Sequence, residues 1–169
     1  MKLSVIIPNY NHGEFIEEQV DAIINQEYKC CELIIIDDKS TDDSVDIIKK
    51  IIKKNPNENI TLIENEKNIG PLNIFNKGLD LSSGDYIIFP SADDRICKNL
   101  FQEAFLMFNK YPQSGMFSAL GYQMDKKGRF QNLVSSPLIS KVKIYLNSSD
   151  VKKYLSKYGF WIVGQTMIF

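Results

Sequence analysis

The chain has 169 residues, 44% of them apolar and 24% charged, and its 20 Lys and Arg residues nearly balance its 21 Asp and Glu residues. These proportions are typical of a folded globular protein and exclude a disordered, collagen-like or coiled-coil chain. The net charge of −1 provides no basic field to hold nucleic acid, and no apolar run approaches the roughly 20 residues of a membrane span. Three cysteines, an odd number, do not make a disulfide framework. We therefore expect a soluble cytoplasmic protein with no nucleic-acid partner.

Short apolar runs alternate with amphipathic stretches through the first two thirds of the chain. The pattern predicts strands at residues 3–7, 33–36, 60–63 and 86–89. It predicts helices at residues 14–26, 72–81 and 100–110, and another helix that begins with cap residues at 40–42 and ends at about residue 54. The first strand is expected to be buried on both faces and to end at Pro8. Repeated strand–helix–strand units predict an α/β fold with a mainly parallel sheet and helices on both faces.

The pattern changes after Pro112. Strands at residues 115–124 and 130–134, around a turn at 125–128, predict an antiparallel hairpin. Residues 147–150 are typical of a helix cap, and residues 160–169 are typical of a strand. No repeat or linker divides residues 1–169, which we therefore expect to form a single domain. Since domains usually end in polar sequence, the apolar end predicts that this chain is part of a longer protein.

Polar residues follow three of the predicted strands. They lie at 8–12, at Asp37 and Asp38, and at 91–94. In an open α/β sheet, ligands bind at the carboxyl ends of the strands, where the strand order reverses. Paired carboxylates repel one another and favour a cation between them, and Mg²⁺ or Mn²⁺ prefers such oxygen ligands. Tyr10 offers a stacking face for a nucleobase, and Asp38 an acceptor for a ring N–H. Taken singly, each Asp pair is also compatible with ordinary turn and helix-cap chemistry.

Other phosphate-binding motifs are missing. The chain contains no GxxxxGK[ST] motif and no GxGxxG motif after the first strand, which disfavours P-loop and dinucleotide-binding domains. A metal ion together with a helix N-terminus is the remaining way to hold a diphosphate.

Several short motifs resemble, in order and spacing, those of the family 2 glycosyltransferases with the GT-A fold. They are LSVIIPNYN at 3–11, DDxSxD at 37–42, NIG at 68–70, Asn76, GDYI at 84–87 and ADD at 92–94. The resemblance covers residues 2–99 and continues only in outline beyond them. It implies a nucleotide-sugar-binding half at residues 1–99 and the incomplete start of an acceptor half at residues 100–169.

The resemblance implies a metal-dependent, inverting hexosyltransferase that moves a sugar from a nucleotide-diphospho-sugar, a UDP-sugar above all, to a saccharide or lipid-linked acceptor. Bacterial enzymes of this type build cell-surface polysaccharides at the cytoplasmic face of the membrane. The resemblance is therefore compatible with peripheral association of this protein with that face of the membrane. Pro8 and Tyr10 would line the base pocket, and Asp38 would accept a hydrogen bond from uracil. Asp93 and Asp94 of the DxD motif would hold the ribose and the diphosphate, with Asp94 as the direct ligand of Mn²⁺ or Mg²⁺.

The sequence departs from the family pattern in two places. Ser91 stands where the motif often begins with Asp, so the metal shell has one carboxylate fewer. The family's general base, an Asp or Glu beyond the last predicted strand, has no counterpart, because Asp150 is the last carboxylate. We therefore assign no catalytic base, and we expect little or no sugar transfer from these 169 residues alone.

Two alternatives remain open from the residues. A nucleotide-binding module without transfer activity, such as a phospho-acceptor receiver domain, would carry its acid pair after the first strand, where this chain has Asn9 and Tyr10. A nucleotidyltransferase would carry a glycine-rich, Arg-containing loop there, and residues 8–11 contain neither Gly nor Arg.

Overall fold

The computed structural model of the chain describes residues 2–125, 128–133, 140, 142–159 and 164–169. Four parallel strands form its main sheet: β1 (Leu3–Asn9), β2 (Glu32–Asp37), β3 (Ile60–Glu64) and β4 (Tyr86–Ile88). Four helices accompany them: α1 (Gly13–Ile24), α2 (Ser44–Lys54), α3 (Pro71–Leu81) and α4 (Leu100–Lys110). The predicted strands and helices of the first 110 residues are confirmed in type and order.

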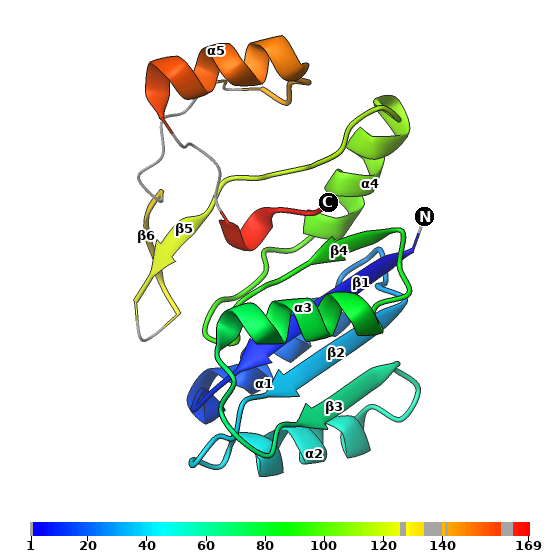
Figure 1. The fold of residues 1–169 in the computed structure, drawn as a ribbon, viewed down its shortest axis with the longest axis vertical. Helices are drawn as coiled ribbons and strands as arrows, with labels where there is room; N and C mark the ends of the chain where they lie inside the picture. The colour runs from blue at the N-terminus through cyan, green and yellow to red at the C-terminus, as the bar shows by residue number, and fades with distance from the viewer. Residues whose placement is uncertain (1, 126–127, 134–139, 141, 160–163) are drawn as a thin grey trace.

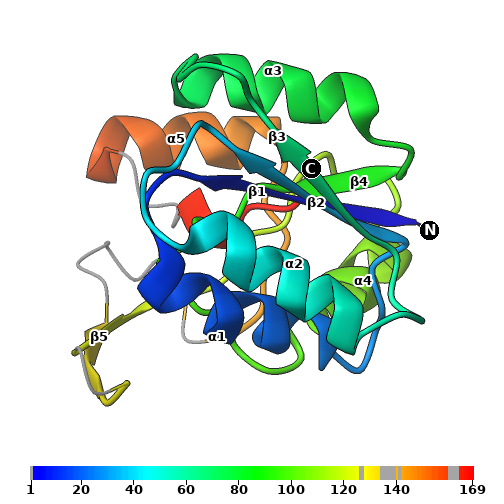
Figure 2. The same cartoon turned by 90° about the horizontal axis from the view of Figure 1, so that it is seen from below.

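Helices cover both faces of the sheet. Figure 2 shows α1, α2 and α4 on one side and α3 on the other. Successive side chains of a strand point to opposite faces, so β1 contributes side chains to two hydrophobic cores, one on each face of the sheet. Its residues Val5 and Ile7 pack with α1, α2 and α4, whereas Ile6 packs with Ile74 of α3. The predicted parallel sheet with helices on both faces is confirmed.

The strand order is β3-β2-β1-β4 (Figure 1). The chain steps outward from β1 to β3, and α3 then carries it back across the sheet to β4 on the other side of β1. The carboxyl ends of β1 and β4 therefore lie at the point where the strand order reverses, which is where an open α/β sheet binds ligands.

The prediction that the first strand ends at Pro8 is wrong, because β1 continues to Asn9. The Asn9 carbonyl accepts a hydrogen bond from the Asp38 N–H on the β2 side, at 2.8 Å. The backbone groups of neighbouring residues in a strand form hydrogen bonds on opposite sides, so the backbone nitrogen of Pro8 faces β4. Since β4 pairs with β1 only as far as Val5, the missing N–H of Pro8 breaks no ladder bond.

The later part of the chain contains an antiparallel hairpin of β5 (Tyr122–Met124) and β6 (Phe130–Leu133), as predicted. The prediction that β5 begins at residue 115 is wrong. Phe117 instead forms an isolated bridge with Ile168. Residues 126–127 and 134 of the predicted hairpin lie outside the described part of the chain.

Helix α5 (Ser148–Tyr158) begins at the predicted place, with a capping box formed by Asn147 and Asp150. The predicted strand at residues 160–169 is wrong at Gly164–Thr166, which forms a 3-10 turn, whereas Ile168 forms antiparallel bridges with Ile88 and Phe117. Residues 160–163 lie outside the described part. Within the described residues, no helix combines the length and apolar character needed to cross a bilayer.

Candidate functional site

The carboxylate of Asp38, directly after β2, fastens the loop that leads into α3. It accepts hydrogen bonds from the backbone N–H groups of Ile69 (2.9 Å) and Gly70 (2.8 Å) and from the Asn65 side chain (2.9 Å). The residue as a whole is only 2% exposed. Burial raises the pKa of Asp38, but these bonds and the nearby charge of Lys77 outweigh it and hold the pKa below its ordinary value. Asp38 is therefore an ionised carboxylate whose main contacts are within the protein.

The neighbouring Asp37 ties the loop after β2 to the end of β1. It accepts hydrogen bonds from the Asn9 side chain (2.8 Å) and from the N–H (2.9 Å) and hydroxyl (2.6 Å) of Ser40. The buried Asn9 Oδ1 has no hydrogen-bond partner among the residues that the structure describes. The buried Asp37 and the half-buried Ser40 thus set the shape of the loop.

The N-cap position predicted at residues 40–42 is wrong by one residue, although Asp42 Oδ1 accepts from the N–H of Ser44, the first residue of α2, at 3.0 Å. The N-cap is Asp43, whose side chain makes no capping bond. Thr41 instead donates its N–H to the Asn11 side chain at 2.7 Å, and Asp42 accepts from the Gly13 N–H at 2.9 Å. These residues fasten the loop after β2 to the start of α1, so the two loops at this sheet edge are held together.

Pro8 and Tyr10 lie at the end of β1, between the Asp38 loop and the end of β4. Pro8 is half-buried, and Tyr10 is 46% exposed. An exposed aromatic ring at the reversal point of the strand order can stack on a planar ligand.

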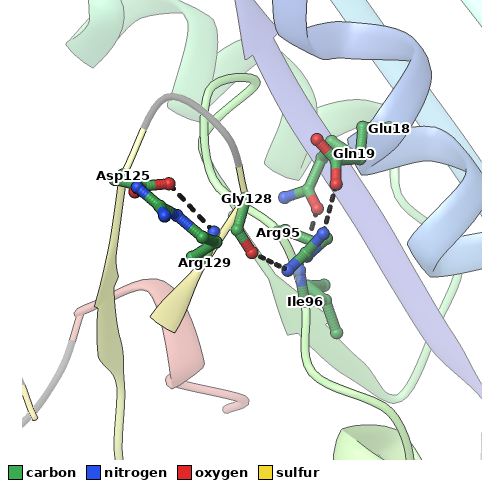
Figure 3. Close-up of polar contacts among 7 residues, drawn as sticks. All are labelled: Glu18, Gln19, Arg95, Ile96, Asp125, Gly128 and Arg129. Carbon is green, nitrogen blue, oxygen red and sulfur yellow. Dashed lines mark hydrogen bonds and ion pairs between the residues drawn. The ribbon is translucent and has the colours of Figure 1, made fainter. Parts of the chain in front are cut away.

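The loop that carries Asp93 and Asp94 is held by two buried amide side chains, Gln19 of α1 and Gln26 just after the end of that helix. Gln19 accepts from the Ile96 N–H at 3.0 Å (Figure 3). It also donates to the Ser91 carbonyl at 2.9 Å. Gln26 donates to the Cys97 carbonyl at 3.1 Å. The side chains of Gln19 and Gln26 therefore fix both ends of the segment in which the two carboxylates lie.

Sequence reasoning missed Gln19 and Gln26. A signal was present, because each comes three residues after an apolar residue of the buried face of α1, Ile16 and Ile23 respectively. A polar side chain within an apolar helix face needs a hydrogen-bond partner once buried, and here the partners are backbone groups of the 91–97 loop.

The Asp94 carboxylate of this loop has no group among the described residues that offsets its charge. Burial raises its pKa, and the charge of Asp93 raises it further. Among the described residues, no hydrogen-bond donor or cation contacts the Asp94 carboxylate, whereas Asp93 accepts from the Ser91 hydroxyl. A divalent cation between Asp93 and Asp94 would offset both the burial and the repulsion, so the pair fits such an ion.

The described residues do not surround this place with enough ligands to enclose a cation. Within the described part of the chain, His, Cys, Asp and Glu residues form no group of three or more that could hold a metal ion. Two carboxylates leave several positions for water and for ligand phosphates, which is the usual arrangement around Mg²⁺.

A cavity of about 710 Å³ opens between the Asp93–Asp94 loop and the hairpin. Its lining includes Asp93, Asp94, Arg95, Tyr122 and Phe130. The other predicted residues, Pro8, Tyr10 and Asp38, lie at the same carboxyl edge of the sheet but outside this lining. The structure thus joins the two predicted metal ligands in one cavity and places the predicted base-binding residues at the same edge of the sheet, outside the lining of that cavity.

The family model for Glycosyl transferase family 2 matches residues 4–155. The poly(ribitol-phosphate) beta-glucosyltransferase of Bacillus spizizenii is 40% identical over 99 residues, which are 57% of this chain and 15% of that protein. This chain spans less than half the length of the curated relatives that it matches.

Two solved structures share the fold. The mannosyltransferase PcManGT from Pyrobaculum calidifontis, in complex with GDP-Man and Mn²⁺, has a TM-score of 0.65 and 26% identity, over 70% of this chain and 35% of that one. TarS 1-349 from S. aureus, in complex with UDP-GlcNAc, has a TM-score of 0.62 and 29% identity, over 70% of this chain and 34% of that one.

Proposed function

Since the chain belongs to glycosyl transferase family 2, we propose that it is the donor-binding part of an inverting hexosyltransferase that uses Mn²⁺ or Mg²⁺. Its donor is a UDP-sugar, and its acceptor is a saccharide or a lipid-linked saccharide in cell-surface polysaccharide synthesis. The observation that carries this proposal is the half-buried Asp94 carboxylate, which has no hydrogen-bond or ion-pair partner among the described residues and lies beside Asp93 in a cavity next to the reversal point of the strand order.

Each predicted residue has a role in this proposal. Asp94 would hold the cation directly, and Asp93 would contact the ribose and the cation-bound diphosphate. When bound, the cation supplies charge neutralisation for the leaving diphosphate. Tyr10 would stack on the base and Pro8 would line its pocket. A carboxylate offers about four acceptor positions, so Asp38, which uses three, keeps one for a ring N–H of uracil.

The comparisons support the ligand classes. One structural neighbour binds GDP-Man with Mn²⁺ and another binds UDP-GlcNAc. By its name, the relative from Bacillus spizizenii adds glucose to a poly(ribitol-phosphate). A nucleoside diphosphate with Mn²⁺ is therefore the first ligand to test.

The test is a calorimetric titration of the protein with UDP and with GDP, each with and without Mn²⁺. The wild type is expected to bind UDP more tightly when Mn²⁺ is present. Asp94→Asn is expected to lower the Mn²⁺-dependent affinity by at least about tenfold, because it removes a charged ligand of the cation. Asp80→Asn, an exposed site on α3, is the matched control and should bind as the wild type does. A wild-type protein that binds neither nucleotide, with or without Mn²⁺, would refute the proposal.

A further inference from the structure

Arg95 directly follows the two predicted cation ligands and contacts two separate parts of the molecule. Its guanidinium forms an ion pair with Glu18 of α1 and donates to the Gly128 carbonyl of the hairpin at 3.3 Å (Figure 3). Its Cζ atom also lies 5.6 Å from the centre of the Phe130 ring, within the range of a cation–π contact. One side chain therefore connects α1, the Asp93–Asp94 loop and the hairpin.

The backbone at Arg95 has little freedom. The neighbouring Ile96 N–H is bound to the buried Gln19, one position along α1 from Glu18. With its backbone fixed in this way, Arg95 can lose its hairpin contacts only if its side chain turns or the hairpin moves.

The hairpin, in contrast, is weakly anchored by packing. All four residues of β6 are exposed. The ion pair of Arg129 with Asp125 lies within the hairpin itself and does not fasten it to the sheet. The contacts of Arg95 with Gly128 and Phe130 therefore weigh heavily in holding the hairpin against the cavity that contains Asp93 and Asp94.

Glu18 also determines where the charge of Arg95 lies. Because the guanidinium pairs with Glu18, it forms no ion pair with Asp93 or Asp94 in the described structure. The two carboxylates stay available to a cation even though a positive side chain follows them directly.

We infer that Arg95 is a positioning residue that couples the docking of the β5–β6 hairpin to the binding of a cation and a nucleoside diphosphate at Asp93 and Asp94. The inference rests on the proposed function of that site. A docked hairpin forms one wall of the cavity, so each event strengthens the other, and the coupling acts in both directions.

The experiment compares Arg95→Met, which keeps the length of the side chain, with the wild type. Arg129→Met is the matched control, since it removes an arginine whose ion pair lies within the hairpin. Mn²⁺ affinity is measured by electron paramagnetic resonance with saturating UDP. Hydrogen exchange of residues 122–125 and 128–133 is measured with and without Mn²⁺ and UDP, and thermal unfolding shows whether each variant is folded.

Arg95→Met is expected to weaken Mn²⁺ binding by about tenfold, which lies within the usual range of coupling between sites. Arg129→Met is expected to change it by less than about twofold, as for most exposed ion pairs. Mn²⁺ with UDP should slow hydrogen exchange in the hairpin of the wild type and of Arg129→Met, but not in that of Arg95→Met. Arg95→Lys, which keeps the charge but has no planar fork, should restore Mn²⁺ affinity only in part.

A merely structural role for Arg95 would lower the unfolding temperature without removing the ligand-dependent protection of the hairpin. If folded Arg95→Met binds Mn²⁺ as tightly as Arg129→Met and keeps that protection, the inference is wrong while the proposed function stands. If the wild type binds neither Mn²⁺ nor UDP, the proposed function is wrong and the inference fails with it.

Discussion

At the scale of single residues, Asp38 combines deep burial with three hydrogen bonds to its charged carboxylate. In Asp38→Asn, an NH₂ group faces donors of the 65–70 loop, so at least one buried donor loses its acceptor. We expect the free energy of unfolding to fall by about 2 kcal/mol, as for other hydrogen bonds to charged groups. Urea unfolding at neutral pH measures this, with Asp80→Asn as the exposed control.

The same residue predicts a pH dependence. The pKa of Asp38 is lower in the folded than in the unfolded protein, so its stabilisation is present above the unfolded pKa of about 3.9 and is lost as the pH falls through the folded pKa. Stability should therefore decrease on acidification below about pH 4, and less steeply in Asp38→Asn. The pKa values of Glu32 and Asp42 are also lowered, so these residues maintain part of the dependence of stability on pH in the variant. If the stability of the wild type and of Asp38→Asn fell equally steeply with pH, the lowered pKa of Asp38 would be contradicted.

The sequence predicted which carboxylates lie at the strand ends, because that follows from where each apolar run stops. It could not predict what they contact. The donors to Asp38 come from residues 65–70, after the next strand, and Gln19 is bound to a loop more than 70 residues away. Such partners are set by the tertiary arrangement and leave no regular spacing in the chain.

At the scale of elements, α3 can approach β1 closely because Gly78 has no side chain. A Cβ atom at this position would lie 2.5 Å from Cγ2 of the fully buried Ile6. We expect Gly78→Ala to lower the free energy of unfolding by about 2 kcal/mol, since overpacking outweighs the higher helix propensity of alanine. Asp80→Ala, two residues further along α3 and exposed, should be nearly neutral in the same urea titration. Equal stability of the two variants would show that α3 can shift to accommodate a methyl group.

Elements with a strong apolar period were predicted well. Helix α4 has the predicted bounds, and its residues Phe101, Ala104, Phe105 and Phe108 form a buried face at helical spacing. The errors concern segments with little burial or with distant partners. The pattern of residues 115–121 is that of a strand, yet in the described part of the chain Phe117 forms an isolated bridge with Ile168, some 50 residues later. No sequence period reveals that contact.

At the scale of the whole molecule, cooperative stability is concentrated in the sheet. All but one residue of β1 and of β2 are buried, whereas every residue of β6 is exposed. Amides of β1 and β2 should therefore exchange with solvent most slowly, and those of the hairpin most rapidly, in the protein without ligands. Hydrogen exchange followed by mass spectrometry tests this order. Slow exchange throughout the hairpin would show that it unfolds only together with the sheet.

The strand order explains why motifs far apart in the chain form one site. The loops after β1, β2 and β4 meet at one edge only because the crossover through α3 places β4 beside β1. The match to Glycosyl transferase family 2 decides between this arrangement and the two alternatives left open by the sequence, the receiver domain and the nucleotidyltransferase.

The bridge of Ile168 to Ile88 has a consequence for self-association. Phe169 donates its N–H to the Ile87 carbonyl and accepts from the Ile87 N–H, so residues 168–169 lie antiparallel along the outer margin of β4 (Figure 1). An uncovered strand margin offers its free amide groups to a second molecule and invites aggregation. Residues 168–169 cover that margin of β4. The opposite border of the sheet is β3, where Thr61 and Glu64 are exposed, and polar side chains at such a border discourage strand pairing between molecules.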